Sequence, residues 1–255
     1  MTGEQLAVVS GGGTGIGRAI AARLAGDGYR VVILGRRADV LERAREEIEW
    51  TVGPDRIVPL TVDLTDPEAV EEVARRIGEL GPVDALVNNA GASVPVPEDG
   101  SLAALARSWR HGLESNLLTA VLLTTALQSR LRRPGGRLVV ISSTAAQRGG
   151  AGPYSAGTYA AAKAALHGWA FGLARELGSE GITVNVLAPG YIEETEIFGS
   201  WWSEEFHARK IADTLVGRAG TPTDVADAVG YLVSPAAGYV TGQVIGVNGG
   251  AVLGR

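Results

Sequence analysis

The chain has 255 residues, a net charge of −5 and no cysteine. The absence of cysteine excludes disulfides, thiolate catalysis and cysteine-ligated zinc, and an acidic chain without a lysine- or arginine-rich block does not suit a nucleic-acid-binding protein. The length suits one large α/β domain with a sizeable core.

Metal sites and membrane segments are not expected either. The histidines, His111, His167 and His207, fall in no metal-ligand spacing. The N-terminus has no basic region followed by a long apolar run, and no stretch approaches a membrane span. These features predict a cytoplasmic, soluble protein that binds no metal and contacts no membrane.

Short apolar, β-branched runs alternate with segments of helical period along the chain. The runs lie at 6–9, 31–34, 57–61, 85–88, 138–142, 183–188 and 244–247, and their lack of a two-residue period predicts strands covered on both faces. The helical segments lie at 16–25, 40–48, 67–80, 113–131, 159–177 and 222–232, with capped starts at Asp66-Pro67 and Thr221-Pro222. This alternation predicts an α/β fold, a doubly wound parallel sheet in a single domain over 1–255. Only 94–110 and 191–214 resist the pattern, and both follow strands.

A glycine-rich turn, SGGGTGIG, joins the first expected strand to the first expected helix. Gly11, Gly15 and Gly17 give the spacing GxxxGxG, with Ser10 ahead of them. Such a turn lets the backbone approach a pyrophosphate, while the free N–H groups of the helix N-terminus face the anion. Glycine also gathers in turns for conformational reasons alone, but the place of this turn between strand and helix favours a dinucleotide.

The stretch TYAAAKAA sets Tyr159 and Lys163 four residues apart on one helical face. Alone, this pair could be a surface lysine beside a half-buried tyrosine. Together with the glycine turn and LVNNAG (86–91), in this order and over nearly the whole chain, it resembles the classical short-chain dehydrogenase/reductase family. The ending is similar to the bacterial members called 3-oxoacyl-[acyl-carrier-protein] reductases. The resemblance implies a Rossmann-type sheet of about seven strands, an NAD or NADP cofactor, and hydride exchange with a carbonyl/alcohol pair.

The resemblance also implies catalytic roles for Tyr159, Lys163, Ser143 and Asn116. Tyr159 matches the acid/base, Lys163 its partner that binds the nicotinamide ribose, Ser143 the serine that binds the substrate oxygen, and Asn116 a member of the proton relay. An adjacent ammonium favours a phenolate, which fits this pairing. A lone asparagine in a helical pattern is otherwise usually solvent-facing.

Two neighbouring residues are rejected as alternatives. Ser142 faces the opposite way from Ser143 on a strand. Four residues after Tyr154 the chain has Thr158, which cannot supply the positive charge that Lys163 supplies to Tyr159.

The end of the second strand favours NADP over NAD. Gly35 occupies the place of the acid that would bind the ribose 2′-hydroxyl, and Arg36 and Arg37 follow, which suits a 2′-phosphate. Asp63 resembles the aspartate that contacts the adenine amine, although capping of the next helix is an equal alternative. The full set predicted to bind the cofactor is Ser10, Gly11, Thr14, Gly15, Ile16, Gly17, Arg36, Arg37, Asp63, Leu64, Asn89, Ala90, Gly91, Tyr159, Lys163 and Ile192.

The chain departs from the family pattern at two places near the substrate. The interval between Ser143 and Tyr159 is a few residues longer than usual. The family commonly places threonine two residues after the residue that matches Ile192, whereas here that position is Glu194 and Thr195 comes one later. Either a one-residue bulge or backbone groups would then hold the carboxamide.

The substrate is indicated only by class. The expected lid, about 191–214, carries Ile197, Phe198, Trp201, Trp202 and Phe206, which suggests a partly apolar or ring-containing substrate, or else a helix that packs on its own domain. Arg130, Arg132 and Arg133 could dock an acidic carrier protein. Glu180 and the acidic chain favour a free small-molecule carbonyl instead.

We therefore expect an NADP(H)-dependent carbonyl reductase with Tyr159 as acid/base. The alternatives are an NAD-dependent polyol, sugar or steroid dehydrogenase, a 3-oxoacyl-[acyl-carrier-protein] reductase, and, least, a non-catalytic dinucleotide sensor.

The resemblance implies a homotetramer that pairs through two long helices and the last strand. The predicted interface stripes are Leu166, Trp169, Ala170, Leu173 and Leu177 on one helix and Leu117, Val121, Thr124 and Leu127 on the other, with Ala161, Ala165 and Gly168 allowing close approach.

Overall fold

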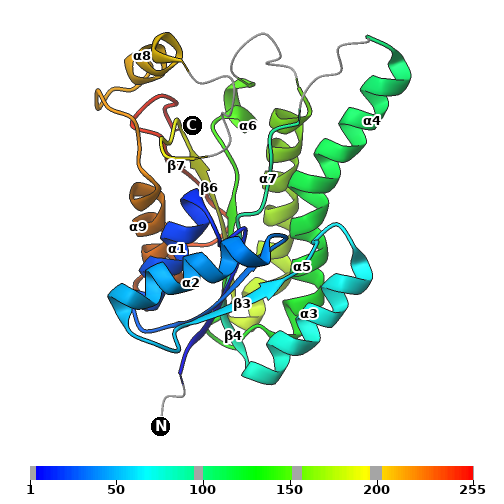
Figure 1. Cartoon of the computed structure of the whole chain (residues 1–255), viewed down its shortest axis with the longest axis vertical. Helices are drawn as coiled ribbons and strands as arrows, with labels where there is room; N and C mark the ends of the chain where they lie inside the picture. Colours follow the sequence, from blue (N-terminus) through cyan, green and yellow to red (C-terminus); the bar gives the residue numbers. More distant parts are fainter. Residues whose placement is uncertain (1–3, 95–99, 151–156, 196–202, 255) are drawn as a thin grey trace.

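The computed structural model describes residues 4–94, 100–150, 157–195 and 203–254. Within these ranges the chain forms a parallel sheet in the order β3-β2-β1-β4-β5-β6-β7 (Figure 1). The strands are β1 (Leu6–Ser10), β2 (Arg30–Gly35), β3 (Ile57–Thr61), β4 (Val83–Asn88), β5 (Arg137–Ile141), β6 (Thr183–Pro189) and β7 (Val244–Val247). This is the order of a doubly wound, Rossmann-type sheet, so the predicted fold is confirmed. Each predicted strand lies within two residues of the observed one at either end.

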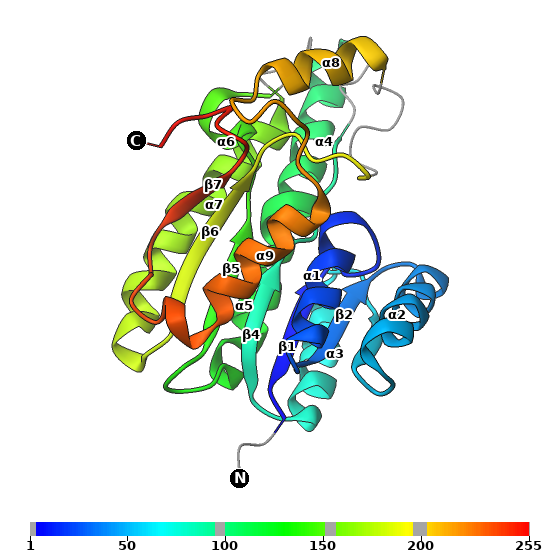
Figure 2. The ribbon, with the colours of Figure 1, turned by 90° about the vertical axis from the view of Figure 1, so that its left-hand side faces the viewer.

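The strands bury both faces because they are apolar without alternation. In β1, Leu6 and Val8 enter the core on one side of the sheet, whereas Ala7 and Val9 enter the core on the other. Helices α3 (Pro67–Leu80), α5 (Thr119–Leu127) and α7 (Thr158–Leu177) cover the first side, and α1 (Gly15–Gly26), α2 (Ala38–Val52) and α9 (Pro222–Val233) cover the second (Figure 2). The ends of the strands are therefore the natural place for a binding site.

The consecutive helical elements before β5, over 102–130, include a helix that the sequence pattern did not predict. Helix α4 (Leu102–Leu113) continues into the π-turn η1 (Glu114–Leu118), α5 and the 3-10 turn η2 (Gln128–Arg130). The prediction that 94–110 is irregular is therefore wrong from residue 102 onward. A cap was present, since the Ser101 hydroxyl accepts the amide of Ala104 at 3.1 Å. The π-turn shifts the phase of the apolar pattern, so no single helical period runs through the segment.

A second helix interrupts the expected lid. Helix α8 (Glu204–Ala212) begins at a cap in which the Ser203 hydroxyl accepts the amide of Phe206 at 3.1 Å. Residues 196–202, which carry most of the predicted lid aromatics, lie outside the described residues, as does Tyr154. The short α6 (Ala145–Arg148), η3 (Gly178–Glu180) and η5 (Pro235–Ala237) complete the helical elements of the described ranges.

The predicted interface stripes are wrong in detail because the chain's own sheet covers them. On α7, Leu166, Ala170 and Leu177 are almost completely buried in the core. On α5, Thr124 and Leu127 are buried in the same way. Over 161–172, the surface that α7 leaves open consists of Phe171, which is 42% exposed, and of small residues that include the three predicted to allow close approach: Ala161, Ala164, Ala165, Gly168 and Gly172.

None of the described helices has the length and apolarity needed to cross a membrane. Over the same ranges, no cluster of three His, Cys, Asp or Glu side chains could hold a metal ion.

Candidate active site

The candidate site lies at the carboxyl ends of β1, β4 and β5. β1 pairs with β2 on one side and with β4 on the other. The chain that leaves β2 and the chain that leaves β4 lead to helices on opposite faces of the sheet. Ligands of doubly wound sheets bind where this switch occurs.

The glycine turn passes directly against the start of α1. Gly11 and Gly15 have φ angles of 64° and 48°, a region that side chains disfavour. A Cβ on Gly17 would lie only 2.0 Å from the Gly11 carbonyl oxygen, so no other residue fits there without moving the turn. The close approach that the sequence predicts for a pyrophosphate loop is present.

Ser10 and Asn89 fasten this turn to the loop after β4. The buried Ser10 hydroxyl accepts the amides of Asn89 and Ala90 at 2.9 and 3.0 Å, and the Asn89 amide nitrogen donates to the Ser10 carbonyl at 3.0 Å. The side chains of Ser10 and Asn89 both form hydrogen bonds to other groups of the protein. They position the glycine turn, and any contact that they make with a cofactor is additional.

The N-terminus of α1 suits an anion. Its N-cap residue, Thr14, is extended and makes no side-chain cap, and the first turn, which contains Ile16, holds no acidic residue. By contrast, Asp66 caps α3 with two hydrogen bonds and Thr221 forms a capping box with Asp224 at α9. The N–H groups at the start of α1 thus lack the caps that these two helices supply for themselves, which fits a bound phosphate.

The end of β2 places Arg36 near Asp63. Arg36 and Arg37 are both exposed, and Arg36 helps to lower the pKa of Asp63. The main cause of that lowered pKa is local, since Thr65 donates its amide and hydroxyl to Asp63 Oδ1 at 2.9 and 2.8 Å. Asp63 does not cap α3, because Asp66 does. Leu64 is buried beside it.

Ser143, Tyr159 and Lys163 come together across β5 and α7. The Ser143 hydroxyl accepts the amide of Ala145 at 3.1 Å, and it lies close enough to the Tyr159 phenol to lower the pKa of that phenol. Lys163 is 4% exposed, and its Nζ donates to the Ile141 carbonyl at 3.0 Å and lies 5.8 Å from the centroid of the Tyr159 ring.

Burial dominates the electrostatics of this group. It raises the pKa of the Tyr159 phenol, although the Ser143 hydrogen bond acts in the opposite direction. It also lowers the pKa of Lys163 to about 8. Burial and Ser143 are the causes of the Tyr159 shift, and Lys163 is not one of them, so the expected effect of the ammonium on the phenol stays a prediction. The phenol is held protonated, in the form that donates a proton.

Asn116 is buried in the π-turn and links α4 to the loop after β4. Its Oδ1 accepts the amide of Ala92 at 3.0 Å, while its Nδ2 donates to the carbonyls of Ala92 and Gly112 at 2.8 and 3.0 Å. It does not face solvent, contrary to the usual place of such a residue. A Cβ on Gly91 would lie 2.7 Å from Asn116 Oδ1 and 3.1 Å from Lys163 Nζ, so both groups meet at Gly91.

Ser142 and His167 form a link that sequence reasoning missed. The Ser142 hydroxyl donates to the Lys163 carbonyl at 2.9 Å and lies 2.8 Å from His167 Nε2. This fastens the end of β5 to α7 and so fixes Ser143 relative to Lys163. The signal was the spacing of His167, which follows Lys163 by one helical turn.

The loop after β6 returns to the glycine turn. Glu194 adopts a left-handed φ of 57°, and Thr195 Cγ2 lies 3.4 Å from the position of a Cβ on Gly15. A local backbone adjustment at Glu194 thus brings Thr195 to the cofactor side, as the first of the two alternatives requires. Ile192 is buried, and Tyr191 hydrogen-bonds His207 of α8 at 2.9 Å.

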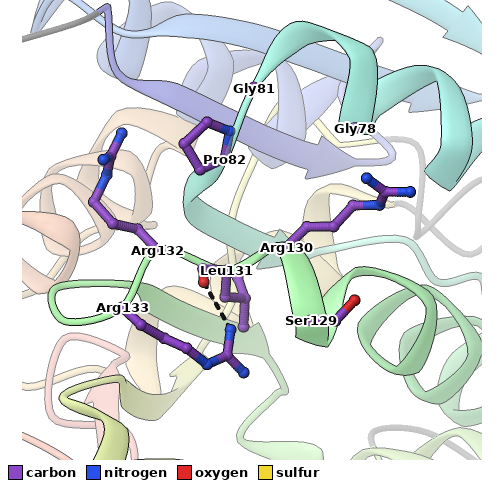
Figure 3. A pocket seen from close by; sticks show the side chains of 8 residues that line it. All are labelled: Gly78, Gly81, Pro82, Ser129, Arg130, Leu131, Arg132 and Arg133. Carbon is purple, nitrogen blue, oxygen red and sulfur yellow. Dashed lines mark hydrogen bonds between the residues drawn. The ribbon is translucent and has the colours of Figure 1, made fainter.

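The arginines considered for carrier docking lie at the amino ends of the central strands β4 and β5, the end of the sheet opposite to the candidate site. Arg130, Arg132 and Arg133 line a hollow of about 450 Å³ with Gly78 and Pro82, next to the start of β4 (Figure 3). Arg132 pairs with Asp84, and Arg133 pairs with Glu180. These residues precede a strand, whereas the site follows strands, so their place could have been foreseen.

Comparisons with known proteins agree with this geometry. A family model described as enoyl-(acyl carrier protein) reductase matches residues 11–252. The 3-oxoacyl-[acyl-carrier-protein] reductase FabG of Escherichia coli (strain K12) is 37% identical over 252 residues, which cover 98% of each chain. The chain belongs to the short-chain dehydrogenase/reductase family.

Other relatives of this short-chain dehydrogenase/reductase support the same conclusion. Protein FixR of Bradyrhizobium diazoefficiens is 35% identical over 96% of this chain and 86% of that protein. A variant of actinorhodin polyketide ketoreductase solved with NADPH matches with a TM-score of 0.84 and 30% identity over 97% of each chain. A dehydrogenase/reductase from Sinorhizobium meliloti 1021 matches with a TM-score of 0.86 and 32% identity over 99% of this chain and 96% of that one. The protein is thus an oxidoreductase that uses a nicotinamide dinucleotide and a small-molecule substrate.

Proposed function

We propose that this enzyme reduces a small, partly apolar carbonyl compound to a secondary alcohol with NADPH. The observation that carries the proposal is the convergence of Ser143, Tyr159 and Lys163, with Asn116 joined to Lys163 through Gly91. We treat residues 1–255 as one domain, with 191–214 beside the substrate.

Each side chain has a role that its geometry supports. The glycine turn would hold the pyrophosphate of the dinucleotide and Lys163 its nicotinamide ribose, and the bound cofactor would supply a hydride. The Tyr159 hydroxyl donates its proton to the carbonyl oxygen, and the Ser143 hydroxyl donates a hydrogen bond to the same oxygen. Lys163 holds the ribose from its buried position, and Asn116 keeps the loop at Gly91 in place. The raised pKa of Tyr159 keeps its phenol protonated near neutral pH, as the proton donor of a reduction must be.

NADPH is favoured over NADH by the end of β2. Gly35 supplies no carboxylate for a ribose 2′-hydroxyl, while Arg36 is exposed at the same edge. Within the described part of the chain, Arg36 makes no ion pair, so its guanidinium is available to a 2′-phosphate.

A thioester of the kind named for the FabG relatives is the second candidate. It is favoured by 37% identity to the Escherichia coli enzyme over nearly the whole chain. The arginines proposed for docking an acidic carrier protein lie at the amino ends of the strands, opposite to the candidate site, which favours a free substrate.

We further propose a homotetramer in the cytoplasm. Apolar side chains stay exposed on α4, the π-turn, α7 and the segment before β7: Leu105, Trp109, Leu113, Leu118, Phe171 and Tyr239. The small residues of α7 beside Phe171 would let a second copy approach closely. A monomer mass of about 26.4 kDa in light scattering would contradict the tetramer.

The reductase proposal is tested by following absorbance of NADPH and NADH with matched ketones and secondary alcohols. We expect oxidation of NADPH by ketones, with kcat/KM at least about tenfold above that with NADH. A preference for NADH with polyols or sterols as substrates would support the dehydrogenase alternative instead.

A further inference from the structure

Two segments that border the active site meet through one ion pair. Helix α6 ends at Arg148, a single turn after Ser143, and α8 lies at the same end of the molecule in both ribbon views (Figures 1 and 2). Arg148 donates to Asp213 Oδ2 at 3.3 Å, just beyond the end of α8. This contact brings the side chains of α6 and α8 into one cluster.

The cluster holds more positive than negative charge. Lys210 Nζ lies 3.8 Å from the same Asp213 oxygen that Arg148 contacts. Arg209 and Lys210 also lie 5.7 and 5.5 Å from the centroid of the Phe206 ring. Asp213 is therefore the single carboxylate paired with these cations in the described ranges. Two acidic residues of α8, Glu204 and Glu205, lie in its first turn, at the other end of the helix.

Lys210 is the unusual member of the cluster. Its side chain is only 9% exposed, yet its ammonium makes no hydrogen bond to any described residue. Burial and the charges of Arg148 and Arg209 lower its pKa, while Asp213 acts in the opposite direction. The dipole of α8 favours cations in its last turn, but an exposed lysine would interact with the dipole equally well, so the dipole does not explain why Lys210 is buried. Among the described residues, the Lys210 Nζ atom is not one of the buried polar atoms without a partner, so it reaches solvent from an otherwise buried side chain. Its one carboxylate, Asp213, is 3.8 Å away and is shared with Arg148, so the ammonium is open to a second anion.

We infer that Arg148 and Lys210 bind an anionic group, a carboxylate or a phosphate, at the end of the substrate remote from its carbonyl. The inference rests on the proposed function, because it takes Ser143 as the residue that binds the carbonyl. One helical turn and the length of an arginine side chain put the Arg148 guanidinium roughly 10–15 Å from the Ser143 hydroxyl. The substrate would then be a chain with a carbonyl near one end and an anion near the other.

The test compares 11-oxododecanoate, which spans such a distance when extended, with its methyl ester and with 10-oxoundecyl phosphate. For wild type we expect kcat/KM to be about ten- to a hundredfold higher for an anionic substrate than for the neutral ester. Lys210→Met and Arg148→Gln should each reduce that ratio by about tenfold or more, through KM rather than kcat. Arg75→Gln, an exposed arginine of α3 that also pairs with carboxylates, is the matched control and should keep the wild-type ratio.

A second measurement separates this inference from the reductase proposal. Dodecanoate, which has no ketone, is titrated calorimetrically into wild type and the same variants with NADPH present. Weaker dodecanoate binding to Lys210→Met and Arg148→Gln than to Arg75→Gln supports the anion site. If no ketone is reduced at the same time, that result counts against the reductase proposal and leaves the anion site standing. Equal acid and ester kcat/KM, or dodecanoate binding that neither variant changes, overturns the anion site. Arg148 is exposed, so its variant decides the matter where Lys210→Met does not fold.

Discussion

At Gly17 the close packing of the glycine turn against α1 leaves no room for a side chain. In Gly17→Ala, the new Cβ would lie 2.0 Å from the Gly11 carbonyl oxygen and 2.5 Å from Asn89 Nδ2. Ordinary contacts between heavy atoms are about 3.5 Å, so the turn and α1 must separate by more than about 1 Å. A shift of this size disrupts hydrogen bonds from the turn to a phosphate, each worth about 1.5–3 kcal/mol when charge-assisted. We expect the Kd for NADPH to rise at least about tenfold.

The stability of the same variant has two opposing contributions. Alanine in a helix gains about 1 kcal/mol over glycine, whereas overpacking costs about 1–3 kcal/mol, so the free energy of unfolding should fall by about 0–2 kcal/mol. Gly26→Ala, at the last residue of α1, is the matched control because its Cβ would meet only Val52 Cγ1 at 3.9 Å. It should gain up to about 1 kcal/mol and leave the NADPH affinity unchanged.

Urea denaturation and titration of NADPH fluorescence measure the two quantities. If Gly17→Ala binds NADPH like wild type and matches Gly26→Ala in stability, the close approach of turn and helix has no role in cofactor binding. The reasoning would then be refuted.

Three further predictions concern the other parts of the site. Because burial lowers the pKa of Lys163 to about 8, its charged form penalises the folded state below that pH, and the penalty is lost as the pH rises toward 10.5. Urea denaturation should therefore show wild type gaining about 3 kcal/mol relative to Lys163→Met between pH 7 and 10.5, and a constant difference would show that Lys163 is not desolvated. Gly35→Asp with Arg36→Ala should shift the ratio of NADPH to NADH kcat/KM by about ten- to a hundredfold toward NADH, and an unchanged ratio would remove both residues from the ribose site. Gly91→Ala, which forces Asn116 aside, should lower kcat by about tenfold or more, and wild-type turnover would show that this loop tolerates displacement.

Much of the fold follows from the sequence because its signals are local and consistent. Apolar strands without alternation predicted a sheet covered on both faces, and the caps at Asp66 and Thr221 predicted the starts of α3 and α9 to the residue. The start of α4 was missed because the π-turn after it shifts the helical phase, and no residue type marks such a turn. The interface stripes were misassigned because periodicity does not tell which face of a helix the sheet takes.

Sequence motifs indicated individual residues of the candidate site. They did not predict the contacts between residues that are distant in sequence. Tyr159 and Lys163 follow from one helical turn, and the glycine turn from its place after a strand. The buried setting of Asn116 depends on Ala92 and Gly112, which only the folded chain brings together. Likewise, no local pattern predicts that Lys210 is buried.

Single-turnover oxidation of NADPH by Tyr159→Phe tests the central claim most directly, with a ketone that wild type reduces. Tyr29→Phe, which loses a buried hydroxyl at the other end of the sheet, is the control. We predict that Tyr159→Phe lowers the rate by about a hundred- to ten-thousandfold with the Kd for NADPH unchanged, while the control keeps wild-type values for both. A Tyr159→Phe enzyme that retained most of its rate would contradict the assignment of this phenol as the proton donor.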